Sequence, residues 1–173
     1  MNTQRTISIF LIAALLSACS NKENEAAPPP AGMHALNLSR YGKPFEIFVP
    51  DTTRSQLQIT EQSSGALEIK VGRSFAISVM EGAADLDLKK SDLKADDVNK
   101  LKNISKDEPD GMIWESAITE PEFHFLRNSR AGSAEYSFED IRAEDGRGYG
   151  KEAIEMMYNS CRDIRAISPQ EPS

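Results

Sequence analysis

Glu122 and His124 combine residue types and a spacing that could perform chemistry. They occupy alternate positions in a short strand pattern, so both side chains are expected on one face of that strand. A carboxylate and an imidazole held side by side are ligands for a divalent metal. Metal sites generally need a third protein ligand, however, and a solvated polar face opposite Phe123 and Phe125 is the simpler interpretation. We therefore predict no metal and no cofactor. If a metal does bind, Glu122 and His124 are the candidate ligands.

The acidic run between Asp85 and Asp97 has the composition of a calcium-binding loop. The EF-hand pattern fails in it, because Lys89 stands where an oxygen ligand belongs and Lys90 replaces the required glycine. Asp96 also stands where the terminal glutamate belongs. A solvated helix face with acids near its N-terminus accounts better for the run.

The glycine-rich segment 146–151 resembles a phosphate-binding loop. A P-loop needs glycine at 145 and serine or threonine at 152, where this chain has Asp145 and Glu152. We expect instead a flexible loop that leads into the last helix, with glycines that could bring the backbone close to a partner. No Gly-x-Ser-x-Gly segment supports serine hydrolase chemistry.

Cys161 lies on an apolar helical stripe, and neither histidine forms a recognisable motif with it. A nucleophilic cysteine needs a nearby base, so a small buried core residue is the favoured interpretation. A hydrolase built from scattered carboxylates stays open as an alternative, because sequence alone does not place two acids across one cleft. We predict no catalytic residue and no enzymatic activity.

Alternation of apolar and polar residues with a period of two predicts antiparallel strands through most of the chain. Turns are expected at 64–65 and 72–73, at the Pro109–Gly111 break and in a loop over 128–132. The predicted strands lie at 45–49, 57–59, 67–71, 75–79, 112–118, 123–125 and 134–138.

Two segments show helical spacing instead. Ser91 could cap a mid-chain helix over 91–104 that carries Leu93 and Ile104. A C-terminal helix over 150–167 has a stripe made of Ile154, Met157, Tyr158, Cys161 and Ile164. The order of elements predicts a single α+β domain over 34–167, in which both helices pack on an antiparallel sheet of about six to seven strands.

The chain has 173 residues, a net charge of −7 and 39% hydrophobic residues, which are ordinary values for one soluble domain. They exclude a multi-span membrane protein, a disulfide scaffold and a wholly disordered chain. A nucleic-acid partner is not expected, because phosphate binding needs a concentrated basic surface.

The N-terminus has the features of a signal peptide over residues 1–18: Arg5 precedes an apolar run that is too short to span a bilayer. The run ends in Leu16–Cys19, which resembles the lipobox of bacterial lipoproteins. That resemblance implies cleavage before Cys19, lipidation of Cys19 and attachment to the lipid bilayer. Ser20 follows, not aspartate, and in Gram-negative lipoproteins this pattern favours the outer membrane. Residues 19–33 are expected to form a flexible tether and residues 168–173 a disordered tail.

Three stretches resemble the PsbP-like superfamily, which includes DcrB-type envelope lipoproteins. They are the opening strand Tyr41–Pro50, the helix predicted at 91–104 and the closing helix Glu152–Ile164. The resemblance implies a sheet covered by helices and a role in binding or assembly support without catalysis. It implies no site residues.

We therefore expect a membrane-anchored envelope lipoprotein whose non-catalytic α+β domain binds or supports an envelope protein partner. Phe48, taken as exposed, and the glycine-rich loop at 146–150 are candidate contacts with that partner. The alternatives are a metal or small-ligand binding lipoprotein that uses Glu122 and His124, and a hydrolase.

Overall fold

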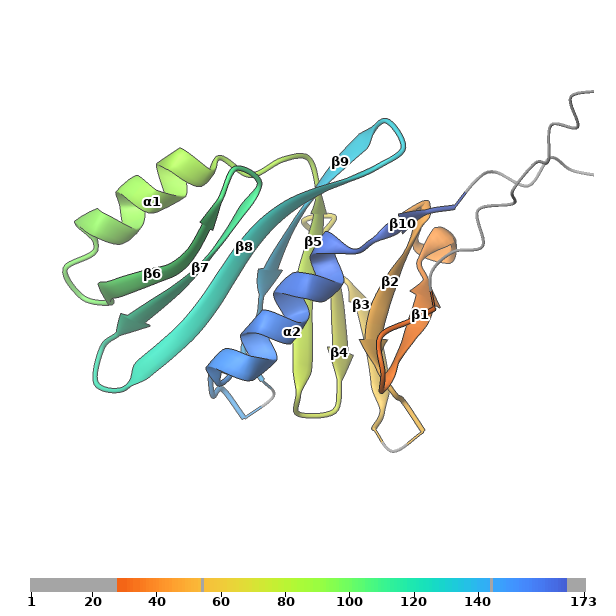
Figure 1. Cartoon of the computed structure of the whole chain (residues 1–173), viewed down its shortest axis with the longest axis horizontal. Helices are drawn as coiled ribbons and strands as arrows, with labels where there is room; N and C mark the ends of the chain where they lie inside the picture. The colour runs from red at the N-terminus through yellow and green to blue at the C-terminus, as the bar shows by residue number, and fades with distance from the viewer. Residues whose placement is uncertain (1–27, 54, 144, 168–173) are drawn as a thin grey trace, which may run out of the picture.

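The structure is a computed structural model that describes residues 28–53, 55–143 and 145–167. The predicted signal peptide, the lipobox with Cys19 and the predicted C-terminal tail lie outside the described residues. The described part forms one α+β domain with two antiparallel sheets and two α-helices (Figure 1). The predicted fold class is confirmed, and so are a mid-chain helix and a C-terminal helix.

The larger sheet has seven strands in the order β3-β4-β5-β9-β8-β7-β6, and each neighbouring pair is antiparallel. Most neighbours are successive strands joined by short turns, which the alternating pattern of the sequence favours. The strands are β3 (Leu57–Glu61), β4 (Leu67–Val71), β5 (Phe75–Glu81), β6 (Lys100–Glu108), β7 (Gly111–Ala117), β8 (Pro121–Ala131) and β9 (Ala134–Asp140).

The smaller sheet joins the two ends of the described chain. It has the order β1-β2-β10, with β1 (Met33–Asn37), β2 (Phe45–Pro50) and β10 (Arg165–Ala166). A short 3-10 helix (Ser39–Tyr41) links β1 to β2 and ends at Gly42, whose φ of 70° is left-handed. The sequence patterns had indicated neither β1 nor β10. The tether predicted over 19–33 ran one residue too far, because Met33 begins β1. The helix predicted over 150–167 also ran too far, because the C-terminal helix ends at Arg162 and the chain then pairs with β2 as β10.

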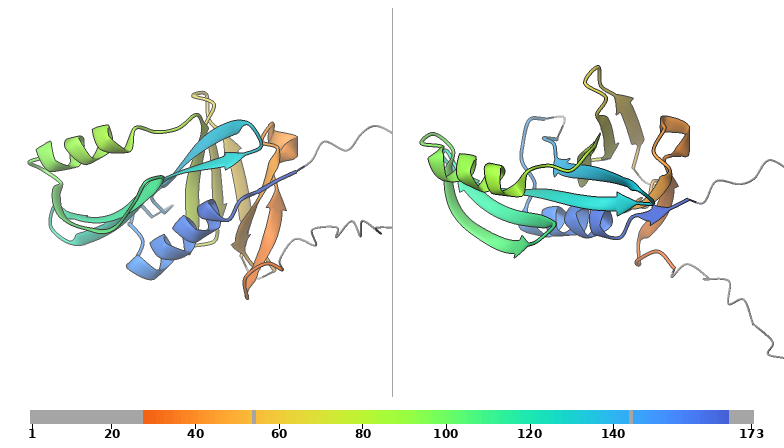
Figure 2. Two further views of the ribbon diagram at one scale, coloured as in Figure 1. Left: turned by 45° about the horizontal axis from the view of Figure 1, so that its top comes forward. Right: turned by 90° about the horizontal axis from the view of Figure 1, so that it is seen from above.

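The two α-helices cover opposite faces of the larger sheet (Figure 2). α2 (Lys151–Arg162) packs on the face of β8 that carries Phe125, whose ring meets that of Tyr158 edge-on at 6.1 Å. α1 (Leu86–Ala95) packs on the other face, against Trp114 and Leu126. Neighbouring residues of a strand point to opposite faces, so Phe125 and Leu126 belong to different layers.

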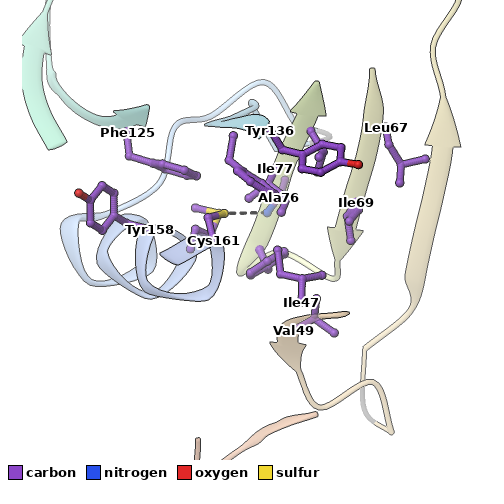
Figure 3. Packing of buried hydrophobic residues seen from close by; sticks show 14 of the residues in the cluster. Ile47, Val49, Leu67, Ile69, Ala76, Ile77, Phe125, Tyr136, Tyr158 and Cys161 are labelled. Atoms are coloured by element: carbon purple, nitrogen blue, oxygen red, sulfur yellow. Dashed lines mark hydrogen bonds between the residues drawn. The ribbon is translucent and has the colours of Figure 1, made fainter. Parts of the chain in front are cut away.

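The apolar residues form two separate clusters. The large core lies between α2, the smaller sheet and the inner faces of β4, β5 and β9 (Figure 3). Its contacts include a hydrogen bond in which the backbone N–H of Ala76 donates to Met157 Sδ at 3.2 Å. The small core lies under α1 and contains the buried residues Leu93, Met112, Trp114 and Leu126.

The predicted helix over 91–104 was wrong in both bounds. α1 begins at Leu86, where the Asp85 carboxylate caps it by accepting a hydrogen bond from Leu88 N at 2.9 Å, and it ends at Ala95. Residues 100–108 form β6 instead. Register shifts after Leu101 and after Ile104 interrupt its alternation with β7. Such bulges let residues three positions apart face the same core, which imitates helical spacing.

The loop predicted over 128–132 was also wrong. β8 continues to Ala131, and the turn follows at Gly132, which has a φ of 62°. The polar residues that suggested a loop have specific partners. Asn128 accepts from Ala84 N at 2.8 Å and donates to Ala84 O at 2.9 Å, which fixes the chain just before α1.

Phe48 was predicted to be exposed, and it is not: 3% of its surface is accessible. The guanidinium of Arg165 lies over its ring, 4.4 Å from the centroid, because β10 pairs beside β2. Cys161 is buried in the large core as predicted, and burial raises the pKa of its thiol well above the usual value.

Candidate functional site

Glu122 and His124 point to one face of β8, and tertiary structure adds two residues that the sequence did not pair with them. His124 Nδ1 lies 2.9 Å from Asp140 Oδ2, and since the carboxylate accepts, Nδ1 carries the proton. His124 Nε2 lies 3.6 Å from Glu122 Oε2. Arg142 donates to both oxygens of Glu122, at 3.0 and 2.6 Å. We call these four residues the His124 cluster.

Register explains how Asp140 reaches the histidine. It stands at the last position of β9, and its Oδ1 accepts from Phe125 N at 2.7 Å, so its other oxygen is directed toward the neighbouring His124. On the other side of the imidazole, the ring of Trp114 on β7 lies 5.4 Å away between centroids. The imidazole is therefore held by a carboxylate and an aromatic ring.

The glycine-rich loop lies beside the same cluster. Arg142 also donates to Gly146 O at 2.9 Å, and Tyr149 forms an isolated antiparallel bridge with Phe123. At Gly148, a Cβ atom would lie 3.6 Å from the Glu122 side chain. Two features that sequence reasoning had treated separately are thus neighbours, and the cluster fastens the segment between β9 and α2 to β8.

The chemistry open to the His124 cluster is limited by these contacts. Both oxygens of Glu122 already accept from a guanidinium, whose positive charge opposes a cation at the same carboxylate. Among the described residues, no group of three or more His, Cys, Asp or Glu side chains is arranged to hold a metal ion. The metal-ligand role of Glu122 and His124 stays an alternative, and these contacts do not favour it.

A serine triad is the second arrangement to consider. Ser116 stands opposite Glu122 on the neighbouring strand, and its Oγ has no hydrogen-bond partner in the described part of the chain. It forms no hydrogen bond with His124, and its accessible surface is 0%. A nucleophile needs both contact with its base and access to substrate, and Ser116 has neither.

A second polar cluster lies on the opposite face of β8, around Arg127. This buried guanidinium donates to Glu108 at 2.9 Å, to Asp110 at 2.8 Å and to the hydroxyl of Tyr158 at 2.6 Å. Tyr158 in turn donates to Glu108 at 2.7 Å. Together these residues, the Arg127 cluster, tie the β6–β7 hairpin to α2.

The electrostatics of the Arg127 cluster follow from those contacts. The hydrogen bond from Tyr158 lowers the pKa of Glu108 below its ordinary value, and Arg127 acts in the same direction. Burial raises the pKa of Tyr158 well above its usual value. At Gly111, a Cβ atom would meet the Tyr158 hydroxyl at 2.7 Å, so the hairpin needs glycine there for this close approach. These contacts stabilise the fold by holding the β6–β7 hairpin against α2.

A groove of about 340 Å³ runs between α1 and the uncovered face of β5 and β9, and we call it the α1 groove. Its lining includes the buried Leu126 together with Met80 and Leu88. Met80 is 37% exposed and Leu88 is 58% exposed, which is unusual for large apolar side chains around a hollow. The remaining lining residues are Ser78, Ala84, Asp85, Lys89, Asp92, Ser137, Phe138 and Glu139.

Sequence reasoning missed the α1 groove. It treated the acidic run as a solvated helix face. It also placed the start of the helix at Ser91, five residues after Leu86, where α1 begins. The available signal was Leu88, an apolar residue in the polar first turns of α1. That signal could be read only once α1 was known to lie over the sheet.

Comparison with protein-family models, with curated proteins and with solved structures finds no match for this chain. The resemblance to the PsbP-like superfamily and to bacterial lipoproteins stays a prediction from sequence. No helix among the described residues is long and apolar enough to cross a membrane.

Proposed function

We propose that this protein is a lipid-anchored lipoprotein of the bacterial outer membrane whose α+β domain binds an envelope protein partner without catalysis. Cys19 is the acylated residue, and the residues between Cys19 and β1 form the tether between bilayer and domain. The lipobox pattern Leu16–Cys19 supports the anchor. Several acyl chains give stable attachment where one does not.

The observation that carries partner binding is the α1 groove. Met80 and Leu88 stand exposed on either side of it, one from a strand and one from a helix. A partner that covers both side chains removes their apolar surface from water, which favours binding by about 25 cal/mol for each Å² buried. Methionine also adapts its shape to different contacts. One known mode of recognition places the apolar face of a partner helix in such a groove.

The arrangement of polar residues supports a binding role over an enzymatic one. The His124 cluster uses its charged groups on each other to fasten a loop, and the Arg127 cluster uses its groups to hold a hairpin to a helix. Both sets of contacts strengthen a rigid scaffold. A rigid scaffold suits a preformed binding surface, because less ordering is then required on association.

The test is site-specific photo-crosslinking in living cells with the full-length protein. A photo-reactive residue at Leu88 samples the α1 groove, and the same residue at Ile118 is the matched control, since Ile118 is apolar and 65% exposed but outside the groove. A Cys19→Ser variant of each shows which products need the anchor. We expect one identified envelope protein to be captured from position 88, not from 118, and to be lost in the Cys19→Ser variant. Equal capture from both positions, or none from position 88, would contradict the proposal.

A further inference from the structure

Three carboxylates line the α1 groove, against a single basic residue, Lys89. Asp85 and Asp92 lie on the helix side and Glu139 on the strand side. None of the three forms an ion pair within the described ranges, although Asp85 caps the helix. Three negative charges around one hollow raise the local concentration of cationic groups, because low-dielectric walls focus the field.

Each basic residue of α1 has a contact or a place of its own. Lys89 lies over the Trp114 ring, 5.4 Å from its centroid, and Lys90 pairs with Asp107 at 2.6 Å. Lys94 lines a different hollow near the end of the helix. The lining of the groove therefore keeps an excess of negative charge, because Lys89 is the one basic residue beside three carboxylates. An occupant that carries positive charge can balance this excess.

From these contacts we infer that the occupant of the α1 groove is a partner segment in which an apolar side chain is flanked by lysine or arginine residues. The inference deepens the proposed function and depends on it. The apolar side chain fills the space between Leu88 and Met80 over Leu126, and the flanking cations meet Asp92 and Glu139 from opposite walls. Complementary charge at the rim sets specificity and association rate more than affinity.

The experiment uses the full-length protein in cells with the photo-reactive residue at position 88. Asp92→Lys combined with Glu139→Lys reverses the rim. Glu61→Lys combined with Glu120→Lys is the matched control, because it changes net charge equally at two exposed acids outside the groove. We expect the rim reversal to lower crosslinking on the order of tenfold, and the control to change it by less than about twofold. Mass spectrometry should place the crosslink within a few residues of a lysine or arginine of the partner.

The outcomes separate this inference from the proposed function. An identified partner whose capture is unchanged by the rim reversal, or whose crosslinked segment is neutral or acidic, overturns the inference and leaves partner binding intact. Equal loss in both charge variants also overturns it, because the effect would then follow net charge and not the rim. No capture from position 88 in the parent protein contradicts the proposed function itself.

Discussion

The two ends of the seven-stranded sheet bury apolar surface very differently. At the β3–β9 end the large core is closed by α2 and by the smaller sheet, and aromatic residues such as Phe138 and Tyr136 are wholly or almost wholly inaccessible. At the β6–β8 end α1 covers a small core with Trp114 and Leu93 at its centre. The comparison teaches that stability and binding are separated: the large core under α2 holds the fold, and the opposite face of the sheet, beside α1, leaves a groove open.

Truncation of the large core should have the largest effect. Phe138→Ala removes a fully buried ring that packs 6.0 Å from Phe45, and we expect it to lower the free energy of unfolding by about 3–5 kcal/mol. Urea unfolding followed by circular dichroism measures this. A loss below about 1 kcal/mol would show that the large core does not dominate stability.

Truncation of the small core should cost less. Leu93→Ala removes the one buried residue of α1, and we expect a loss of about 2 kcal/mol, because 8% of Leu93 is still accessible and the site can partly collapse. Hydrogen exchange should show faster opening of α1 with α2 unchanged. Equal acceleration in both helices would mean that the two cores unfold as one unit.

Acid should weaken the link between the two ends. The folded-state pKa of Glu108 is lowered, so its contribution to stability is full above the unfolded-state pKa of about 4.3 and is lost as pH falls toward the lower folded value. We expect Glu108→Gln to cost about 1 kcal/mol at neutral pH and to flatten the fall in stability below pH ~4.3. Chemical unfolding at a series of pH values tests this. A variant with the parent's acid dependence would contradict it.

Loss of the Glu122–Arg142 pair should be smaller again and local. Arg142 is about half exposed, and exposed ion pairs contribute about 0.2–1 kcal/mol, so Glu122→Gln should barely change global unfolding. Hydrogen exchange should increase in the loop at Gly146–Gly148, which the His124 cluster fastens. Glu120→Gln serves as the neighbouring control, and an equal change there would argue against a specific role for the pair.

Leu88→Ala should separate binding from stability most sharply. Leu88 is 58% exposed, so we expect a stability change within about 0.5 kcal/mol. Affinity purification of the anchored protein should nevertheless recover much less partner. Ile118→Ala, at a comparably exposed apolar position, should change neither quantity. Loss of partner in both variants would move the binding site away from the α1 groove.

The success of the sequence predictions depended on how local the signal was. The strands at 67–71 and 75–79 alternate cleanly and lie where the pattern predicts, and the stripe through Ile154 and Cys161 marks α2 correctly. β6 failed because its bulges depend on pairing with β7, which no window of the sequence contains. Asn128 near the end of β8 suggested a loop because its partner, Ala84, lies 44 positions away in sequence.

The candidate sites divide in the same way. Alternation was enough to put Glu122 and His124 on one face, because a strand has a period of two. Asp140 and Arg142 joined them only through the register of β8 with β9 and the path of the chain beyond it. The α1 groove depended on which face of the sheet α1 covers, and α1's own sequence is too weakly apolar to specify that.

Local chemistry therefore determined the alternating strands, the amphipathic final helix, the buried thiol and the lipobox pattern, since each depends on neighbours within one or two turns of chain. Tertiary structure decided that one strand, β8, presents His124 to one layer and Arg127 to the other, that Phe48 is covered, and that Leu88 and Met80 share an open groove. These outcomes depend on pairing between segments that are far apart in the chain. The local pattern is compatible with several such pairings, and loop closure and packing decide which of them forms.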